Sequence, residues 1–210
     1  KKKTKKRLQS KCVSADSMKR RRITEQQMGF GYACRGSIPS LLNDLEERGV
    51  LCIAEETFLD IGAGSGDILQ DVQSECRHTW GVEMNLEWFD KTPEIWKSRI
   101  KWCKLEDVDV AECCDMASTS IAYMYDLCLK RLSRRALSYE EDPHWAIQNI
   151  LLDSSKMPAL KYFISTYEQE HMQSLHGNRW VLVHSKKIPC STDCYVFYVY
   201  ERCSVDTNMQ

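Results

Sequence analysis

The chain has 210 residues, of which 43% are hydrophobic and 28% charged, so it is long enough for one domain with a buried core and short extensions. No apolar run approaches the roughly 18 residues that a membrane-spanning helix needs, and no apolar segment follows the basic N-terminus as it would in a signal peptide, so we expect an intracellular protein without a membrane partner. The eleven cysteines include no Cys-x-x-Cys pair, which favours free thiols over disulfides and predicts no metal site.

The formal net charge of −1 hides a division between the first 22 residues and the rest. Residues 1–22 hold eleven Lys and Arg against one acid, Asp16, a balance of +10, so the other residues together carry −11. The clusters at 1–7 and 19–22 are typical of nuclear-import or polyanion-binding segments, because adjacent cations release counterions from a phosphate backbone. A solvated tail without a specific partner is the alternative. We expect residues 1–28 to form a flexible basic arm.

Residues 29–56 are expected to form a loop and a helix ahead of the core. The loop, 29–37, is rich in turn formers, and Pro39 can open a helix that carries three leucines and runs to Gly49. This loop is either a plain connector or a lid over a bound ligand. The core then occupies residues 57–210.

A turn that contains three glycines follows the first strand of the core. Residues 57–61 have the length and apolar character of a buried strand, and Gly62, Gly64 and Gly66 lead from it into a helical pattern. Glycine permits a sharp turn and lets a ligand approach the backbone, while the N-terminus of the helix offers unpaired N–H groups. This strand, turn and helix are typical of a ligand-binding corner in an α/β fold.

Two acids flank this turn. Asp60 lies near the end of the first strand, and Glu83 lies at the end of the next strand-like run, where a carboxylate can bind both hydroxyls of a ribose. The sequence therefore predicts a site for a nucleoside derivative. The spacing G-x-G-x-G after an acid differs from the dinucleotide pattern G-x-G-x-x-G, and the Gly-Lys-Ser/Thr of a P-loop is absent.

The remaining pattern predicts a sheet with a long connection before its last strands. Residues 130–177 are expected to be helical, with one helix near 145–152 and an amphipathic one that has Leu160, Phe163, Ile164, Tyr167 and Leu175 on one face. The strand at 180–185 is expected to be central, and the last strand antiparallel. We count six strands, at 57–61, 78–82, 99–105, 119–126, 180–185 and 195–202.

The glycine turn with its two acids resembles the first motif of class I S-adenosylmethionine-dependent methyltransferases. The resemblance implies an α/β, Rossmann-like fold, with a mostly parallel sheet of six or seven strands and helices on both faces. It also implies S-adenosylmethionine as cofactor, its amino group near Asp60, its amino-acid and ribose portion along the glycines, and its ribose on Glu83. Adenine is expected at the end of the third strand, on Asp109 or alternatively on Asp107.

Several further blocks resemble the non-SET histone-lysine methyltransferases named for disruptor of telomeric silencing. The matching blocks are 76–83, 105–110, 117–121, 177–179 and the segment 35–37, where Gly36 corresponds to the glycine of the family's cofactor loop. The resemblance implies a nuclear enzyme that methylates a core histone in nucleosomes, and the basic arm would then bind nucleosomal DNA. The family has Asn-Asn-Phe after its fourth strand, whereas this chain has Tyr-Asp-Leu at 125–127.

Methyl transfer requires a neutral acceptor close to the methyl group in a site without water. We expect Tyr125 and Tyr198 to line an aromatic channel that lowers the pKa of a lysine, with Asp126 either bonding the amine or fixing its loop. Two alternatives stay open. One is an RNA or small-molecule methyltransferase with the same cofactor site, and the other is a catalytically silent binding module.

Overall fold

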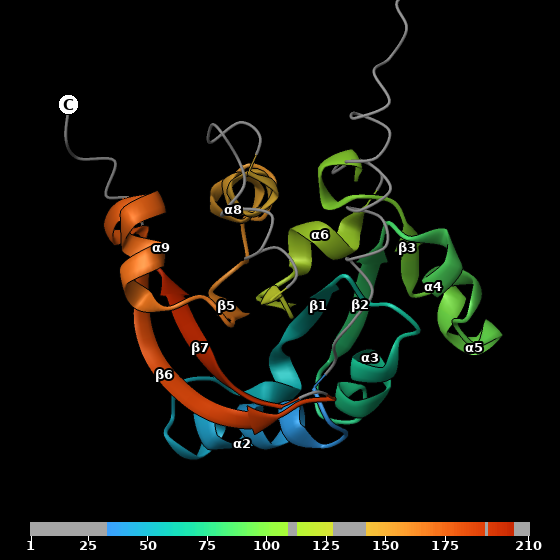
Figure 1. Ribbon diagram of the computed structural model, residues 1–210, viewed down its shortest axis with the longest axis horizontal. Coiled ribbons are helices and arrows are strands. Elements are labelled where there is room, and N and C mark those ends of the chain that lie inside the picture. The colour runs from blue at the N-terminus through green and yellow to red at the C-terminus, as the bar shows by residue number, and fades with distance from the viewer. Residues whose placement is uncertain (1–32, 109–112, 128–141, 192, 204–210) are drawn as a thin grey trace, which may run out of the picture.

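The computed structural model describes residues 33–108, 113–127, 142–191 and 193–203, and the predicted basic arm lies outside these ranges (Figure 1). Seven strands form one sheet in the order β3-β2-β1-β4-β5-β7-β6. The strands are β1 (Thr57–Ile61), β2 (His78–Glu83), β3 (Ile100–Trp102), β4 (Ile121–Met124), β5 (Tyr162–Ser165), β6 (Trp180–Pro189) and β7 (Cys194–Arg202). The helices are α2 (Ser37–Glu47), α3 (Asp67–Val72), α4 (Leu86–Asp90), α5 (Glu94–Lys97), α6 (Cys114–Ser118), α8 (Pro143–Leu152) and α9 (Gln169–His176), with single turns η1 (Ile53–Glu55), η2 (Leu105–Asp107) and η4 (Gly177–Arg179).

Strands β1 to β5 are parallel to one another, and β7 is antiparallel to both β5 and β6. The mostly parallel sheet with a reversed last strand is therefore confirmed. Parallel neighbours need crossover connections, which the helices supply on both faces of the sheet (Figure 1). No helix among the described residues is long and apolar enough to cross a membrane.

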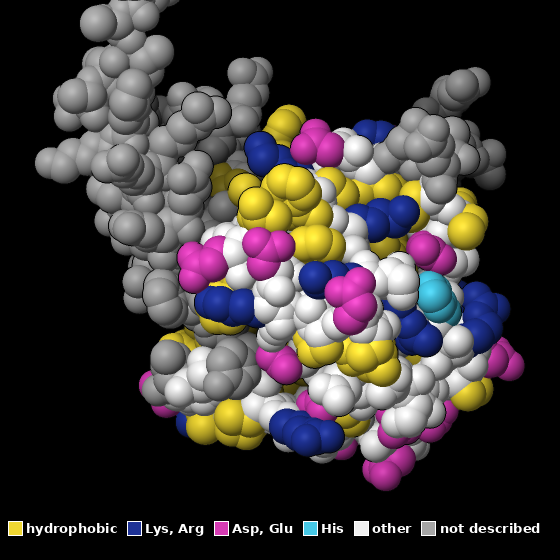
Figure 2. Space-filling view, turned by 90° about the vertical axis from the view of Figure 1, so that its right-hand side faces the viewer, with side chains coloured by type: hydrophobic (Ala, Val, Ile, Leu, Met, Phe, Trp, Pro, Cys, Tyr) yellow, Lys and Arg dark blue, Asp and Glu magenta, His cyan; other side chains and the backbone are white. Residues whose placement is uncertain are grey.

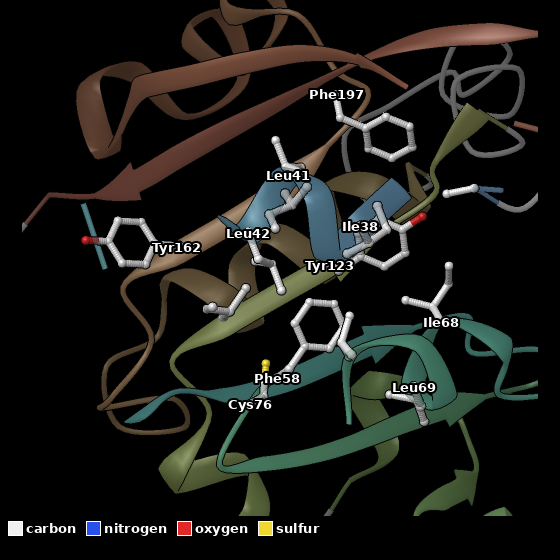
Figure 3. Close-up of a cluster of buried hydrophobic side chains, with 14 of the residues drawn as sticks. Ile38, Leu41, Leu42, Phe58, Ile68, Leu69, Cys76, Tyr123, Tyr162 and Phe197 are labelled. Carbon is white, nitrogen blue, oxygen red and sulfur yellow. The ribbon is translucent and has the colours of Figure 1, made fainter. Parts of the chain in front are cut away.

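The core consists of two layers, one on each face of the sheet. Helix α2 buries its apolar side completely against the first face, where Figure 3 shows Leu41 and Leu42 of this helix near Phe58 of β1 and Tyr123 of β4. Helices α6, α8 and α9 cover the second face. Alternate residues of a strand point to opposite faces, so Phe58 belongs to the first layer and the adjacent Leu59 to the second. Helix α2 was predicted, and it begins at Ser37, two residues before Pro39.

The prediction of an amphipathic helix over residues 160–167 is wrong. Residues 162–165 form β5, which pairs with β4 on one side and with β7 on the other, and the helix α9 begins only at Gln169. Apolar residues at 160, 163, 164 and 167 match the helical period, but a strand buried on both faces also has consecutive apolar residues. β5 is therefore the one strand that the six strands expected from the sequence did not include.

The expectation that residues 180–185 form a central strand is also wrong. They begin β6, which lies at the edge of the sheet and pairs only with β7. The middle of β6 is half-buried or exposed, as an edge strand with one uncovered side requires. The order of strands depends on connections between distant segments, so an apolar run alone does not place a strand in the middle of a sheet.

Candidate active site

The predicted glycine turn lies at the carboxyl ends of β1 and β2. Gly62, Gly64 and Gly66 all have positive φ, at +83°, +56° and +86°, which is the backbone region that favours glycine. The N–H groups of Gly62 and Ala63 donate to the carbonyl oxygen of Val82 at 2.9 and 3.0 Å, which fixes the turn to β2. A Cβ atom at Gly62 or Gly64 would have no described atom within 4 Å. The turn therefore presents open backbone to a ligand.

Glu83 is buried at the end of β2 and connects the two neighbouring turns. One carboxylate oxygen accepts from the Gly64 N–H at 2.8 Å, and the other accepts from the Asn85 N–H at 2.7 Å. Burial raises the pKa of Glu83, although these N–H groups oppose the rise by stabilising the charged form. The prediction that Glu83 lies beside the glycine turn is confirmed by the Gly64 contact.

Asp60 is 2% exposed, and no donor among the described residues forms a hydrogen bond to its carboxylate. Burial, together with the negative charges of Glu83 and Asp67, raises the pKa of Asp60 to about 8. A cation placed next to Asp60 would offset the free-energy cost of keeping its carboxylate charged at a buried position. The carboxylate therefore suits a ligand that carries a positive charge.

Gly81 is a structural requirement of this site that the sequence reasoning missed. A Cβ atom at Gly81 would lie 2.7 Å from Cβ of Ala63 and 3.1 Å from the backbone oxygen of Asp60. Only a glycine lets β2 approach the turn this closely. Its position two residues before Glu83, inside a strand, is the signal that could have revealed it, since glycine in a strand often marks a close backbone approach.

The site has an apolar rim beyond Glu83. Met84 and Trp102 are 41% and 54% exposed, the Trp102 indole N–H donates to the Met84 carbonyl oxygen at 3.3 Å, and the Trp102 ring stacks on Phe89 with centroids 6.5 Å apart. Figure 2 views the molecule from the side of β3, α4 and α5 and shows hydrophobic side chains gathered among charged ones. An aromatic ring of a ligand bound to Glu83 would find an apolar surface here.

Gly36 lies at the start of α2, and its N–H donates to Oδ2 of Asp71 at 2.6 Å. Arg35 forms an ion pair with the same carboxylate at 3.3 Å, and the Cys34 N–H donates to the Pro189 carbonyl oxygen at 2.9 Å. These contacts attach the segment before α2 to α3 and to β6. The role of Gly36 in cofactor binding stays a prediction. Asp109 lies outside the described residues, and its alternative, Asp107, is exposed at the end of η2.

Asp126 follows β4 and is fully buried. Its carboxylate accepts from the hydroxyl groups of Ser165 and Thr166 and from the Thr166 N–H at 2.9 Å, while Nε2 of His144 lies 3.6 Å from Oδ2. Burial alone would raise the pKa of Asp126, but His144, Ser165 and Thr166 together lower it. These contacts fit the alternative in which Asp126 fixes the loop that follows β4.

The structure does not bring the two predicted channel tyrosines together. Tyr125 packs on the first face of the sheet, where its ring lies 5.9 Å from Phe197 and 6.1 Å from Tyr195. Tyr198 belongs to the second face, where its ring lies 6.4 Å from Tyr200. Because the sheet separates them, Tyr125 and Tyr198 do not form one aromatic wall around a lysine side chain.

Two solved structures have a similar fold at low sequence identity. Magnesium protoporphyrin IX methyltransferase (ChlM) from Synechocystis PCC 6803, with bound SAM, has a TM-score of 0.54 at 10% identity, over 92% of this chain and 87% of that chain. Sp1610 from Streptococcus pneumoniae, a candidate tRNA (m1A22) methyltransferase, has a TM-score of 0.50 at 10% identity, over 79% of this chain and 72% of that chain. No protein-family model matches the chain, and a search of curated proteins also finds no match. The chain has the Rossmann-like fold of class I methyltransferases, as the sequence predicted.

Proposed function

We propose that this protein is an S-adenosylmethionine-dependent methyltransferase whose acceptor is RNA. The observation that carries the cofactor assignment is the glycine turn with open backbone at Gly62 and Gly64, next to two buried carboxylates at the carboxyl end of the sheet. Ligands of open α/β sheets bind at this edge. When bound, the cofactor supplies an electrophilic methyl group on a sulfonium.

The residues present fit this cofactor by charge and by shape. Asp60 offers a buried negative charge to the cofactor's cationic amino group, and Glu83 offers carboxylate oxygens to the ribose hydroxyls. The apolar surface at Met84 and Trp102 can cover adenine. Because Gly62 and Gly64 have no side chains, the space that the amino-acid portion of S-adenosylmethionine needs stays open. These residues bind and orient the cofactor, and they shield it from water.

One observation favours RNA over a histone lysine as the acceptor, and another is compatible with it. A lysine needs an apolar aromatic channel that penalises its charged form, and the two tyrosines expected to build one lie on opposite faces of the sheet. The eleven Lys and Arg in residues 1–22 are compatible with RNA, because they would attract any phosphate backbone, that of nucleosomal DNA included, in a salt-sensitive way. RNA was the alternative acceptor in the sequence analysis. The histone lysine, which was the first hypothesis there, is now the alternative that the experiment tests.

Methyl transfer from labelled S-adenosylmethionine tests this function. The full chain is incubated with total RNA in one arm and with nucleosomes in another. We expect label in RNA, and Gly64→Arg should reduce it at least 100-fold, because the new side chain fills the open space at the turn. Label in nucleosomes alone would contradict the acceptor assignment.

Gly49→Arg is the matched control for that variant. Gly49 also has a positive φ, +70°, and open space around its missing Cβ, but it follows α2 and lies outside the glycine turn. It therefore reproduces the backbone strain without occupying the site. Gly49→Arg should retain labelling, and equal loss in both variants would contradict the placement of the cofactor.

A further inference from the structure

The buried pair formed by His144 and Asp126 is not explained by cofactor binding. His144 lies in the first turn of α8, where its N–H donates to the helix cap Asp142 at 2.9 Å, and its side chain has no exposed surface. Its ring stacks on Tyr167 with centroids 3.8 Å apart. Its Nε2 faces Oδ2 of Asp126 at 3.6 Å, which is ion-pair distance but longer than a hydrogen bond, and neither ring nitrogen has a hydrogen-bond partner among the described residues.

The pairing decides which nitrogen of a neutral His144 can accept a proton. A neutral imidazole has one N–H and one lone pair. Because Nε2 faces a carboxylate whose charged form is stabilised by Ser165 and Thr166, Nε2 carries the hydrogen and Nδ1 keeps the lone pair. An imidazole that is oriented by a carboxylate at one nitrogen and has a free lone pair on the other is arranged as a general base.

A second polar side chain lies on the same side of α8. Gln148 is one turn after His144, is also fully buried, and has no hydrogen-bond partner for its amide nitrogen or its amide oxygen among the described residues. Buried polar atoms are nearly always paired in native proteins, so these atoms point to a polar ligand beside α8. Asp126 lies two residues after the end of β4, at the edge of the sheet where ligands of this fold bind.

We propose that Asp126 and His144 are the general-base pair of this methyltransferase and that the acceptor is a hydroxyl, the ribose 2′-hydroxyl of RNA. This inference rests on the function proposed above. A hydroxyl is a weak nucleophile until its proton is removed, whereas a ring nitrogen or a neutral amine already has a free lone pair. A buried base is therefore needed for oxygen and not for those nitrogens.

The reaction balances with these groups alone. The hydroxyl proton passes to Nδ1 of His144 as the oxygen forms a bond to the methyl carbon. The carbon–sulfur bond breaks, and its electron pair stays on sulfur, which leaves a neutral thioether. Asp126 stabilises the imidazolium that results, and His144 then releases the proton to water. His144 has no exposed surface, so the side chains that cover it must move when the acceptor enters.

Other titratable groups surround this pair and affect its pH response. Asp126 faces the His144 ring at 3.6 Å, and Asp142 accepts from the His144 backbone N–H. His171 of α9 lies 6.2 Å away by ring centroids, and His176 of the same helix interacts with His144 electrostatically. Burial lowers the pKa of His176 to about 4, so His176 is neutral at physiological pH.

Product chemistry tests the acceptor atom. RNA labelled by the wild-type protein is hydrolysed in alkali, which cleaves RNA only where a free 2′-hydroxyl is present. We expect the label in alkali-resistant dinucleotides, and label in methylated bases would overturn the proposal. If the protein binds S-adenosylmethionine but RNA takes up no label, RNA is not the acceptor and the proposed function fails. That result differs from label in methylated bases, which would leave RNA as the acceptor and overturn only the hydroxyl.

Variants test the base. His144→Gln keeps an amide that can donate to Asp126 but cannot accept the proton, so kcat should fall by about 10²- to 10⁴-fold with cofactor affinity unchanged. Asp126→Asn should give a similar loss by changing the tautomer of His144. A general base makes kcat rise with pH, and His144→Gln should lose any such rise that the wild type shows.

His184→Gln is the control, because His184 and Asp44 form another His–Asp pair, at 3.7 Å between α2 and β6. This control should keep the wild-type rate. The affinity for S-adenosylmethionine, measured in the same samples, shows that each variant is folded. A His144→Gln variant that binds the cofactor and turns over at the wild-type rate would overturn the assignment.

Discussion

At the scale of single residues, Asp60 and Glu83 are two buried carboxylates on neighbouring strands. Burial of Asp60, and then the negative charges of Glu83 and Asp67, raise the pKa of Asp60 to about 8, and no cation forms an ion pair with Asp60 among the described residues. Glu83 accepts hydrogen bonds from two backbone N–H groups, so its negative charge is better stabilised than that of Asp60. The ligand-free protein therefore holds a proton on Asp60 near neutral pH, which a cationic ligand would displace.

This raised pKa predicts a pH-dependent stability. The unfolded value is near 3.8 and the folded value about 8, so the protonated group favours the folded state. The stabilisation is complete below about pH 4 and is lost as pH rises through about 8. Asp60→Asn removes this dependence. Its melting temperature should equal that of the wild type near pH 4 and exceed it at pH 8 to 9, as measured by calorimetry without ligand.

Asp90→Asn is the control, because Asp90 is an exposed carboxylate at the end of α4. In Asp90→Asn, the difference between the melting temperature near pH 4 and that at pH 8 to 9 should be the same as in the wild type. A melting temperature of Asp60→Asn that stays below the wild-type value at pH 9 would contradict the raised pKa of Asp60.

At the scale of elements, the contact between β2 and the glycine turn depends on Gly81. Gly81→Ala brings a methyl group to 2.7 Å from Cβ of Ala63, so the strand or the turn must shift. We expect a loss of about 1–3 kcal/mol in the free energy of unfolding, measured by urea denaturation, together with weaker binding of S-adenosylmethionine. Unchanged stability and affinity would contradict the importance of this contact.

The elements also show what a sequence pattern can and cannot predict. The turn at Gly62 to Gly66 was predictable, because its glycines are close in sequence and each needs a special backbone conformation. The strand β5 was not, because its apolar spacing also matches a helix and only pairing with β4 and β7 decides between them. The edge position of β6 follows from the order of distant strands, which no local pattern contains.

The same reasoning applies to the candidate site. Asp60 and Glu83 were predictable from their places at the ends of two successive strands. The contact of Asp126 with Ser165 and Thr166, and the approach of His144 to it, join elements that are distant in sequence. The separation of Tyr125 from Tyr198 depends on which face of the sheet each residue occupies. Such relations come from the fold as a whole.

At the scale of the whole molecule, the open edge of the sheet divides into two chemical regions. Acids and glycines at the ends of β1 and β2 suit a cationic nucleoside, and the Asp126 and His144 pair lies after β4, the strand next to β1. Cofactor and acceptor would therefore bind side by side. The parallel strands position both regions, because their carboxyl ends meet at one edge.

Titration calorimetry of the full chain with S-adenosylmethionine tests the central claim most directly. We predict binding of one molecule per chain, with an affinity that rises about tenfold per pH unit from pH 6 and levels off near pH 8, because Asp60 must release its proton to the buffer before its carboxylate can pair with the cationic ligand. Heats measured in buffers of different ionisation enthalpy should report that release. An absence of binding heat across this range, or an affinity that does not change with pH, would contradict the account.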